Sequence, residues 1–365
     1  MKHKKDELTA LDLFSGAGGL SLGLKNAGFR VVAGVEIDKA AIKTYKANHP
    51  KTKVLETDIR KVTGAEILKA AGVNHINLIA GCPPCQGFST LTAKYHRTDP
   101  RDDLALEMAR IVVELKPEMV MMENVPGLAK RGKPVLDEFI QMLEAEGYQV
   151  NYAVLQLANY GIPQTRRRFV LLAGKGFEIP IPQPTHAKAP TKDDELTPWL
   201  TTRDILTRIG KPLTLAEAQQ LGGPKKHGWH IIGNVKAITL KRIKAVKPGK
   251  SRAALPKRLR PKCHKRSNEG FQNVYARMSW NQTPPTITGG CTSFCKGRFG
   301  HPKENRTISV REAALIQTFP PDYIFDTTFI SSACDQIGNA LPPKFAWLVA
   351  EQCLSSLDQT LRNKT

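Results

Sequence analysis

The stretch Leu11-Asp12-Leu13-Phe14-Ser15-Gly16-Ala17-Gly18-Gly19-Leu20 joins a short apolar run to a glycine-rich turn and to the first residues of a helical pattern. Glycines allow a tight turn and let the backbone approach a ligand without Cβ contact. They do not follow the Gly-x-Gly-x-x-Gly spacing, and no second signal for pyrophosphate binding is present. The stretch therefore predicts a strand, a ligand-binding turn and a helix, for a ligand without phosphates as readily as for a dinucleotide.

Short apolar runs alternate with amphipathic segments over the first half of the chain. The strand-like runs are Ala10–Phe14, Val31–Val35, Ile76–Ala80, Met119–Met122 and Phe169–Ala173. Helical periodicity covers Leu104–Leu115 and Val135–Glu146, and the second of these segments stops at Gly147. This alternation predicts an α/β fold with a doubly wound, mostly parallel sheet. Ligands of such sheets bind beyond the carboxyl ends of the strands.

Polar side chains fall at those strand ends. Glu36 closes the second strand, where a carboxylate can accept both hydroxyls of a ribose. Asp58 offers an acceptor for an adenine amino group, and Phe14 offers an apolar surface for the ring. Phe14 would serve equally well as a core residue and Asp58 as a helix N-cap, so both alternatives stay open. S-adenosylmethionine has ribose and adenine but no phosphate, and it fits these residues.

A cysteine loop, Gly81–Ser89, follows the third of these strands. Its Cys82 and Cys85 form a Cys-x-x-Cys, which is also found in redox pairs and in halves of metal sites. A zinc site needs two further ligands, and the neighbouring sequence offers none. A cysteine presented in a Pro/Gly-rich loop beyond a strand is placed for chemistry, so a nucleophilic Cys85 is the third alternative.

Two further charged groups belong to the same region. Glu123 follows a strand that holds no other charge, so a carboxylate and a thiol are expected at one sheet edge. Arg166 and Arg168 alternate along an extended run and are expected to share a face. Guanidinium groups hold carbonyl oxygens or phosphates well, although a plain basic edge strand has the same pattern.

Composition points to a polyanionic partner. The 365 residues include 54 Lys and Arg against 33 Asp and Glu, a formal net charge of +21, which favours nucleic acid. Between Ala218 and Asn268 there are 15 Lys or Arg and no Asp or Glu. This basic stretch also holds Trp229 and several branched apolar residues, so it predicts a folded or DNA-ordered element more than a free tail.

The sequence contains no segment that predicts membrane insertion or secretion. No apolar run approaches the roughly 20 residues that span a bilayer, and Met1–Glu7 is charged. Seven cysteines do not suggest a secreted disulfide framework. We therefore expect a soluble intracellular protein.

Taken together, six ordered blocks resemble the DNA (cytosine-5) methyltransferases of bacterial restriction-modification systems. They cover both ends of the chain: Asp12–Gly19, Pro84–Gln86, Glu123–Val125, Gln164–Arg168, Arg311–Pro320 and Gln336–Pro343. Two departures are the additional cysteine Cys82 and Leu341 in place of a commoner valine. The resemblance implies an S-adenosylmethionine-dependent methyltransferase fold with a smaller, basic target-recognition domain. It assigns residues 1–178 to the catalytic and cofactor-binding domain, 179–328 to target recognition and 329–365 to a segment that completes the catalytic domain.

The resemblance also implies roles for individual residues. A cytosine flipped out of the duplex would be attacked at C6 by Cys85, while Glu123 holds N3 and the amine and Arg168, beside Arg166, holds O2. The cofactor would contact Phe14, Ser15, Gly16, Gly18, Gly19, Leu20, Glu36, Ile37, Asp58, Ile59, Pro84 and Asn339. DNA contacts would come from Gln86, Ser89, Arg277, Lys296 and Arg298, the last three near the Thr286–Gly290 turn. No metal is expected.

Partners and rivals complete the prediction. The resemblance implies a bacterial cytoplasmic enzyme that is associated with the nucleoid through DNA. Double-stranded DNA is the expected substrate of a monomeric enzyme, paired in function with a restriction endonuclease but without a stable complex. An RNA cytosine-5 methyltransferase on the same fold would share all catalytic residues. A non-catalytic DNA-binding relic should have lost Cys85, Glu123 or Arg168, and none is lost. A flavin or nicotinamide enzyme would leave Cys85 and the basic stretch unexplained.

Overall fold

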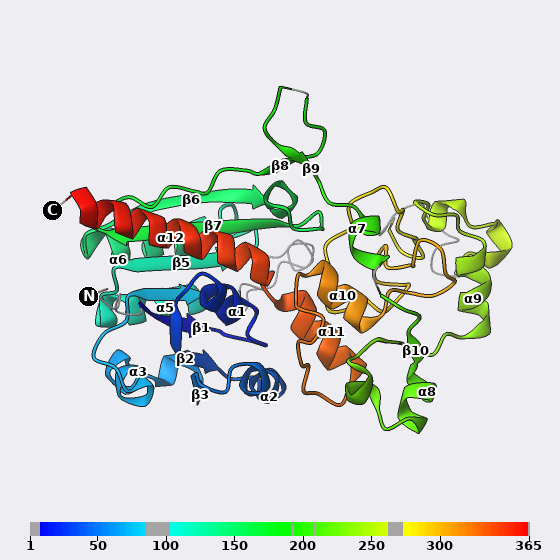
Figure 1. Cartoon of the computed structure of the whole chain (residues 1–365), viewed down its shortest axis with the longest axis horizontal. Helices are drawn as coiled ribbons and strands as arrows, with labels where there is room; N and C mark the ends of the chain where they lie inside the picture. The colour runs from blue at the N-terminus through cyan, green and yellow to red at the C-terminus, as the bar shows by residue number, and fades with distance from the viewer. Residues whose placement is uncertain (1–7, 85–102, 192, 208, 262–272, 364–365) are drawn as a thin grey trace, which may run out of the picture. The chain divides into compact units, whose positions relative to one another are not determined.

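The computed structural model describes residues 8–84, 103–191, 193–207, 209–261 and 273–363 (Figure 1). The chain divides into two compact units. The first comprises residues 1–156, 167–184 and 341–365, and the second comprises residues 157–166 and 185–340. The chain therefore leaves the first unit and returns to it twice.

A seven-stranded sheet forms the centre of the first unit. Its spatial order is β3-β2-β1-β4-β5-β7-β6. The strands are β1 (Thr9–Leu13), β2 (Arg30–Glu36), β3 (Lys53–Glu56), β4 (Leu78–Gly81), β5 (Met119–Asn124), β6 (Tyr148–Gln156) and β7 (Arg167–Lys175). The first five are parallel, whereas β7 is antiparallel to both β5 and β6. The predicted doubly wound, mostly parallel sheet is confirmed.

The central strands are buried on both faces, which explains their continuous apolar runs. All residues of β1, β4 and β5 are buried. Helix α5 occupies Leu104–Leu115, the range that its periodicity predicts, and buries Met108, Ile111 and Val112 in the core. Helix α6 (Lys133–Ala145) is followed by Gly147 with φ 84°, a left-handed conformation that suits glycine at a helix end.

Among the described residues, four more α-helices belong to this unit: α1 (Gly19–Asn26), α2 (Lys39–Asn48), α3 (Gly64–Ala71) and α12 (Pro343–Asn363). Helix α12 comes from the C-terminal end of the chain and packs against α1, as Figure 1 shows. A Cβ built on Gly23 of α1 would lie 2.4 Å from the Ala346 Cβ and 2.7 Å from the Pro343 carbonyl oxygen. The absence of a side chain at Gly23 therefore permits this close crossing.

The second unit contains short elements. Its described residues form η2 (Leu157–Tyr160), β8 (His186–Ala187), β9 (Thr197–Pro198), α7 (Thr202–Leu206), β10 (Leu213–Thr214), α8 (Leu215–Gln220), η3 (Pro224–His227), β11 (Ile231–Ile232), α9 (Ala237–Lys244), η4 (Arg252–Ala254), η5 (Lys257–Leu259), α10 (Val310–Ile316) and α11 (Ile330–Asn339). Helix α9 lies in the basic stretch, and its Ile243 joins Val246, Leu255 and Phe294 in an apolar core. The prediction that this stretch is folded is confirmed for its described residues.

Within the described ranges, no helix has both the length and the apolar character that crossing a bilayer requires.

The strand order reverses between β1 and β4. From β1 the chain proceeds outward through β2 and β3, and then crosses to the other side of β1 to form β4 and β5. In open α/β sheets, the crevice at such a reversal is the usual ligand site. Ser15 follows β1 and Cys82 follows β4, so both lie at this edge.

The contact between α1 and α12 can be tested with Gly23→Ala. Overpacking typically costs about 1–3 kcal/mol, and the cost should fall in the upper part of that range because the Cβ would meet backbone atoms. This exceeds the ~1 kcal/mol that alanine gains over glycine in a helix. Urea unfolding of the variant should show a net loss of stability.

Gly233→Ala is the matched control, since a Cβ at Gly233 would meet no atom within 4 Å. Equal unfolding free energies for Gly23→Ala and the wild type would contradict the close packing of these helices.

Candidate active site

The glycine turn after β1 has an unusual backbone. Phe14, Gly16 and Gly18 have φ values of 59°, 54° and 91°, so even a non-glycine residue adopts the left-handed conformation here. Such strain in a non-glycine residue often marks a functional site. The Ser15 amide donates to the Val35 carbonyl at 3.1 Å, while its buried hydroxyl has no hydrogen-bond partner among the described residues.

Glu36 ties the end of β2 to this turn. Its Oε2 accepts a hydrogen bond from the Gly16 amide at 2.7 Å, and its Oε1 accepts from the amides of Ile37 and Asp38 at 2.8 Å each. The Ile37 side chain is 65% exposed, which is uncommon for isoleucine. The structure thus brings Gly16, Glu36 and Ile37 together at one edge of the sheet.

Asp58 begins the short helix η1 (Ile59–Lys61). Its Oδ1 accepts from the Arg60 amide at 3.0 Å, and the Arg60 guanidinium contacts both carboxylate oxygens. These hydrogen bonds from Arg60 lower the pKa of Asp58. The N-cap alternative for Asp58 is therefore present, while its carboxylate remains at the sheet edge. Ile59 is buried.

A buried polar network of Asp12, Ser21 and Tyr45 stabilises the elements on either side of the turn. The Ser21 hydroxyl donates to Asp12 Oδ2 at 2.6 Å and lies 2.6 Å from the Tyr45 hydroxyl. Asp12 is fully buried, and its other oxygen has no partner among the described residues. Burial is the main reason that the pKa of Asp12 rises to about 7, and nearby Glu36 raises it further.

His49 supports the same turn from α2. Its Nε2 lies 3.0 Å from the Gly18 carbonyl, and its Nδ1 lies 3.0 Å from Lys25 Nζ. Burial, followed by the charge of Lys25, lowers the pKa of His49 to about 3. The ring is thus neutral at physiological pH, with Nε2 as the donor to Gly18 and Nδ1 as the acceptor from Lys25.

The other end of the candidate site lies on β4, β5 and β7. Arg168 Nε forms an ion pair of 2.6 Å with Glu123 Oε1, and both side chains are largely buried. Asn124 Nδ2 donates to the Pro83 carbonyl at 3.0 Å, which holds the start of the cysteine loop against β5. The structure therefore brings Glu123 and Arg168 together, as the sequence predicts, beside the loop that leads to Cys85.

Arg166 differs from its predicted role. Its side chain is buried, and the guanidinium donates to the backbone carbonyls of Ile287, Gly338 and Ala340 within the second unit. Arg168 lies in the first unit, on β7. Alternation predicts a shared face only for a continuous strand, and β7 begins at Arg167. We therefore replace the predicted base or phosphate contact of Arg166 with a structural role.

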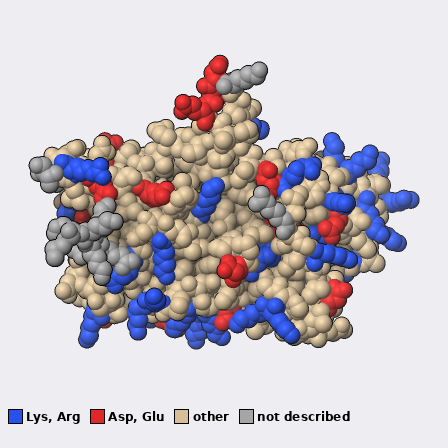
Figure 2. Space-filling view, in the orientation of Figure 1, with Lys and Arg blue, Asp and Glu red and all other residues tan. Residues whose placement is uncertain are grey.

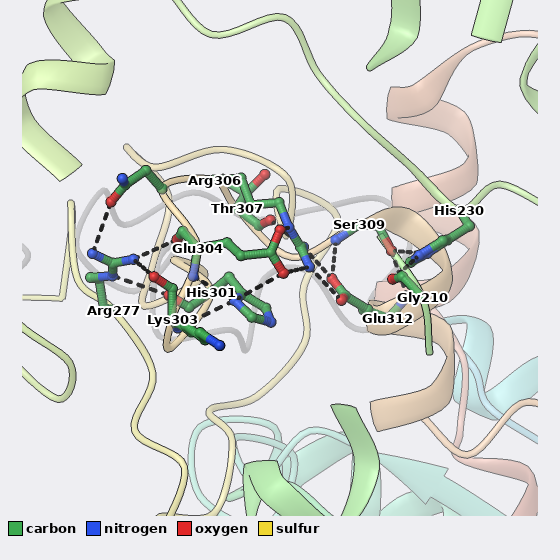
Figure 3. Close-up of polar contacts among 11 residues, drawn as sticks. Gly210, His230, Arg277, His301, Lys303, Glu304, Arg306, Thr307, Ser309 and Glu312 are labelled. Carbon is green, nitrogen blue, oxygen red and sulfur yellow. Dashed lines mark hydrogen bonds and ion pairs between the residues drawn. The ribbon is translucent and has the colours of Figure 1, made fainter. Parts of the chain in front are cut away.

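Arg277 also differs from its predicted role as a base reader. Its guanidinium donates to the backbone carbonyls of His301, Lys303 and Glu304 (Figure 3). It also donates to the carbonyls of Ile243 and Val246. The side chain is buried, so these bonds bring the surrounding loops together. A guanidinium committed to five carbonyls is not available to guanine edges, and sequence alone does not reveal such carbonyl partners.

The same close-up shows a second buried network. Arg306 forms an ion pair of 2.7 Å with Glu312, which also accepts a hydrogen bond from the Ser309 amide (Figure 3). His230 Nδ1 lies 2.9 Å from the Ser309 hydroxyl, and its Nε2 lies 2.7 Å from the Gly210 carbonyl. These contacts fix the start of α10 within the second unit.

The remaining predicted site residues are more dispersed. Lys296 is exposed, whereas Arg298 is half-buried and donates to the Gly249 carbonyl at 2.7 Å. Asn339 is exposed at the end of α11 in the second unit, and Pro84 is half-buried. Cys85, Gln86 and Ser89 lie outside the described residues. Within the described ranges, no group of three His, Cys, Asp or Glu side chains could hold a metal ion.

Sequence reasoning missed the supporting residues of the turn, Ser21, Tyr45 and His49. A buried carboxylate such as Asp12 requires polar partners, so a search for hydroxyls on the next helices would have been justified. Their pairing with Asp12 and Gly18 depends on helix placement, and periodicity does not specify that placement.

The residues beside the reversal of strand order, where β1 and β2 end, fit an adenosine-type ligand. Glu36 offers a carboxylate held by three amides, Ile37 an exposed apolar side chain, and Ser15 a buried hydroxyl without a partner among the described residues. A Cβ built on Gly16 would meet only the Phe14 carbonyl oxygen, at 3.9 Å, so space is open above the turn. The mostly parallel sheet, this ligand edge and the buried carboxylate–guanidinium pair agree with the methyltransferase fold that the sequence resembles.

Comparison with known proteins specifies the family. A family model described as C-5 cytosine-specific DNA methylase matches residues 8–355. The Type II methylase M.HgiDII of Herpetosiphon aurantiacus is 39% identical over 347 residues, which cover 93% of each chain. The Type II methyltransferase M1.HphI of Haemophilus parahaemolyticus is 34% identical, over 95% of this chain and 87% of its own.

Solved structures agree at the level of the fold. A putative DNA modification methyltransferase encoded within an E. coli prophage has a TM-score of 0.70 at 24% identity, covering 96% of this chain and 99% of its own. The S. pombe Dnmt2 methyltransferase has a TM-score of 0.64 at 18% identity, covering 97% and 99%.

This chain belongs to the C-5 cytosine-specific DNA methylase family. It is a DNA (cytosine-5-)-methyltransferase, and its relatives are the methyltransferases of Type II restriction-modification systems. Family membership implies S-adenosylmethionine as the methyl donor and favours DNA over the RNA alternative. The predicted family, fold class and enzyme activity are confirmed.

The buried Asp12 carboxyl makes stability depend on pH. Its folded pKa of about 7 lies above the ordinary value of 3.8, so its contribution to folding is complete below pH ~4 and is lost as pH rises through 7. Between pH 5 and pH 8, the wild type should lose about 2.5 kcal/mol of unfolding free energy relative to Asp12→Asn. Urea unfolding at several pH values measures this difference.

Asparagine retains an acceptor for the Ser21 hydroxyl, so Asp12→Asn should fold. Parallel stability profiles for the two proteins would show that Asp12 is already ionised in the native state at pH 5.

Proposed function

We propose that this chain methylates C5 of a flipped-out cytosine within a specific double-stranded DNA sequence, through a covalent bond between Cys85 and C6. The buried pair of Glu123 and Arg168 is the observation that carries this proposal. The Arg168 guanidinium can donate to O2 of cytosine, and the Glu123 carboxyl group, 2.6 Å away, can accept from the exocyclic amine. Cytosine N3 is itself an acceptor, so its hydrogen bond with Glu123 requires a proton on the carboxyl group or on N3.

The cofactor would be held at the edge formed by β1 and β2. Glu36 would accept hydrogen bonds from the ribose hydroxyls, Asp58 would accept from the adenine amine, and Ile37 and Phe14 would pack against the ring. Ser15, Gly16, Gly18, Gly19, Leu20, Ile59, Pro84 and Asn339 remain proposed cofactor contacts. When bound, S-adenosylmethionine supplies a methyl group on a positively charged sulfur.

The proposed catalytic residues act on different atoms of the cytosine. The Cys85 thiolate adds to C6, which requires the base to leave the stack because C6 is inaccessible in the duplex. Glu123 stabilises positive charge at N3 and accepts from the amine, while Arg168 donates to O2 and keeps the Glu123 carboxylate in place. A base acting through water removes the C5 proton, and the electron pair of that C–H bond expels the Cys85 thiolate from C6 and restores the aromatic ring.

DNA contacts would combine base reading with phosphate binding. Lys296 and Arg298 remain proposed readers of guanine edges, and Gln86 and Ser89 remain proposed contacts near the flipped base. Lysines of the basic stretch would contact phosphates. Figure 2 shows Lys and Arg side chains gathered over the part of the chain that carries α9. We further propose a monomeric enzyme whose residues 179–328 recognise the target, and whose methylation protects DNA from a restriction endonuclease without a stable complex.

Bisulfite sequencing tests the activity. Expression in a bacterial host without cytosine methylation should protect cytosines in one short sequence, and Cys85→Ala should abolish the protection because no covalent bond to C6 forms. Cys295→Ala, which removes an exposed thiol, is the control and should retain protection. Protection that persists in Cys85→Ala would remove the nucleophile assignment.

A second prediction concerns the basic stretch. Lys241, Lys244 and Lys247 are exposed, and their joint replacement by Gln should weaken binding to all DNA sequences alike. If each contacts one phosphate, the slope of log affinity against log salt should decrease by ~0.9 per lysine. Fluorescence anisotropy over a salt series measures this slope.

The control replaces the exposed Lys43, Lys51 and Lys53 of the first unit, which equalises the change in net charge. An effect confined to one DNA sequence would indicate that the α9 lysines read bases instead.

A further inference from the structure

Cys82 has no role in the mechanism proposed above. It is the additional cysteine of the loop, and it follows β4 directly. Its amide lies 3.4 Å from the Leu13 carbonyl, and the next residue, Pro83, accepts the hydrogen bond from Asn124. The backbone at Cys82 is therefore held from β1 on one side and from β5 on the other, so its side chain has a defined position.

The sheet register places Cys82 beside Glu123. Gly81 of β4 pairs with Met122 of β5 in a parallel ladder, so the next residues, Cys82 and Glu123, are neighbours whose side chains leave the same face. Glu123 pairs with Val170 of β7, and Arg168 is two residues away and so shares this face. The Glu123 carboxylate thus lies between a thiol on one neighbouring strand and a guanidinium on the other.

The electrostatics agree with this placement. Burial raises the pKa of the Cys82 thiol well above its usual range, and the charges of Glu123 and Asp12 raise it further. A hydrogen bond from the thiol to the Glu123 carboxylate acts in the same direction. Cys82 therefore stays protonated at neutral pH and offers an S–H donor, while Glu123 offers an acceptor.

We propose that Cys82 is a positioning residue for methyl transfer: its thiol donates a hydrogen bond to the Glu123 carboxylate and, with Arg168, fixes the plane in which that carboxylate meets the base. This inference rests on the proposed function of Glu123. Arg168 occupies one lone pair of Oε1 at 2.6 Å, and a second donor from the opposite side removes the remaining rotation of the group. The free lone pairs then face the base.

Two substitutions separate hydrogen bonding from packing. Cys82→Ser keeps a donor but is smaller, whereas Cys82→Val fills the space without a donor. We expect Cys82→Ser to keep kcat for methyl transfer to DNA within about threefold, and Cys82→Val to lower kcat by about tenfold, the loss of one hydrogen bond to a charged group. The KM values for DNA and for S-adenosylmethionine should stay unchanged in both, because neither ligand contact is removed.

Cys353→Val is the matched control, since it makes the same change at a buried cysteine of the first unit, on α12. It should leave kcat unchanged. Thermal unfolding of each variant checks that the fold is retained. A Cys82→Val enzyme with full kcat, or one that outperforms Cys82→Ser, would assign Cys82 to packing and overturn the inference.

A spectroscopic measurement tests the hydrogen bond without relying on activity. The infrared S–H stretching band of Cys82 is identified as the band that Cys82→Ser removes. In Glu123→Gln this band should move to higher wavenumber, because a neutral amide oxygen is a weaker acceptor than a carboxylate. An unmoved band would overturn the inference even if methylation is normal. A shifted band in a protein that methylates no DNA would support the contact and reject the proposed function.

Discussion

The buried ion pair between Glu123 and Arg168 is the constraint on which the proposed catalytic half of the site depends. A carboxylate with about 7% of its side chain exposed is unfavourable unless a cation or several donors accompany it. Strand β7 supplies the cation because it inserts antiparallel between β5 and β6. An all-parallel continuation would require a crossover helix at this place. The antiparallel insertion of β7 is thus what brings the Arg168 guanidinium to the Glu123 carboxylate.

The proposed cofactor half of the site is stabilised instead by hydrogen bonds to a strained turn. There, the positive-φ turn after β1 would be costly to hold by itself, and several hydrogen bonds compensate. Glu36 accepts a hydrogen bond from the Gly16 amide of the turn, and His49 donates one to the Gly18 carbonyl. Asp12 and Ser21 anchor the adjoining strand and helix. Ser21 and His49 are thus supporting residues outside the six recognised sequence blocks. Glu36, in contrast, both supports the turn and is a proposed ligand contact, and Asp12 lies within the first block.

This distinction explains what the sequence alone could predict. Helix α5 was predictable to the residue because its burial follows a regular period. The parallel strands were predictable because both faces are buried. Arg277 and Arg166 were not, because their partners are backbone carbonyls of distant loops, which have no signature in sequence. Cys82 was visible as a departure from the family pattern, but its neighbour Glu123 is evident only from the register of β4 and β5.

The path of the chain between the two compact units affects how the protein could be recombined with its relatives. Residues 157–166, which end at Arg166, belong to the second unit, yet both flanking strands belong to the first. A chimaera that exchanges only residues 185–340 would bring in new partners for Arg166, because Ile287, Gly338 and Ala340 would all come from the donor protein. Specificity transplants should therefore carry this ten-residue loop along with the larger segment.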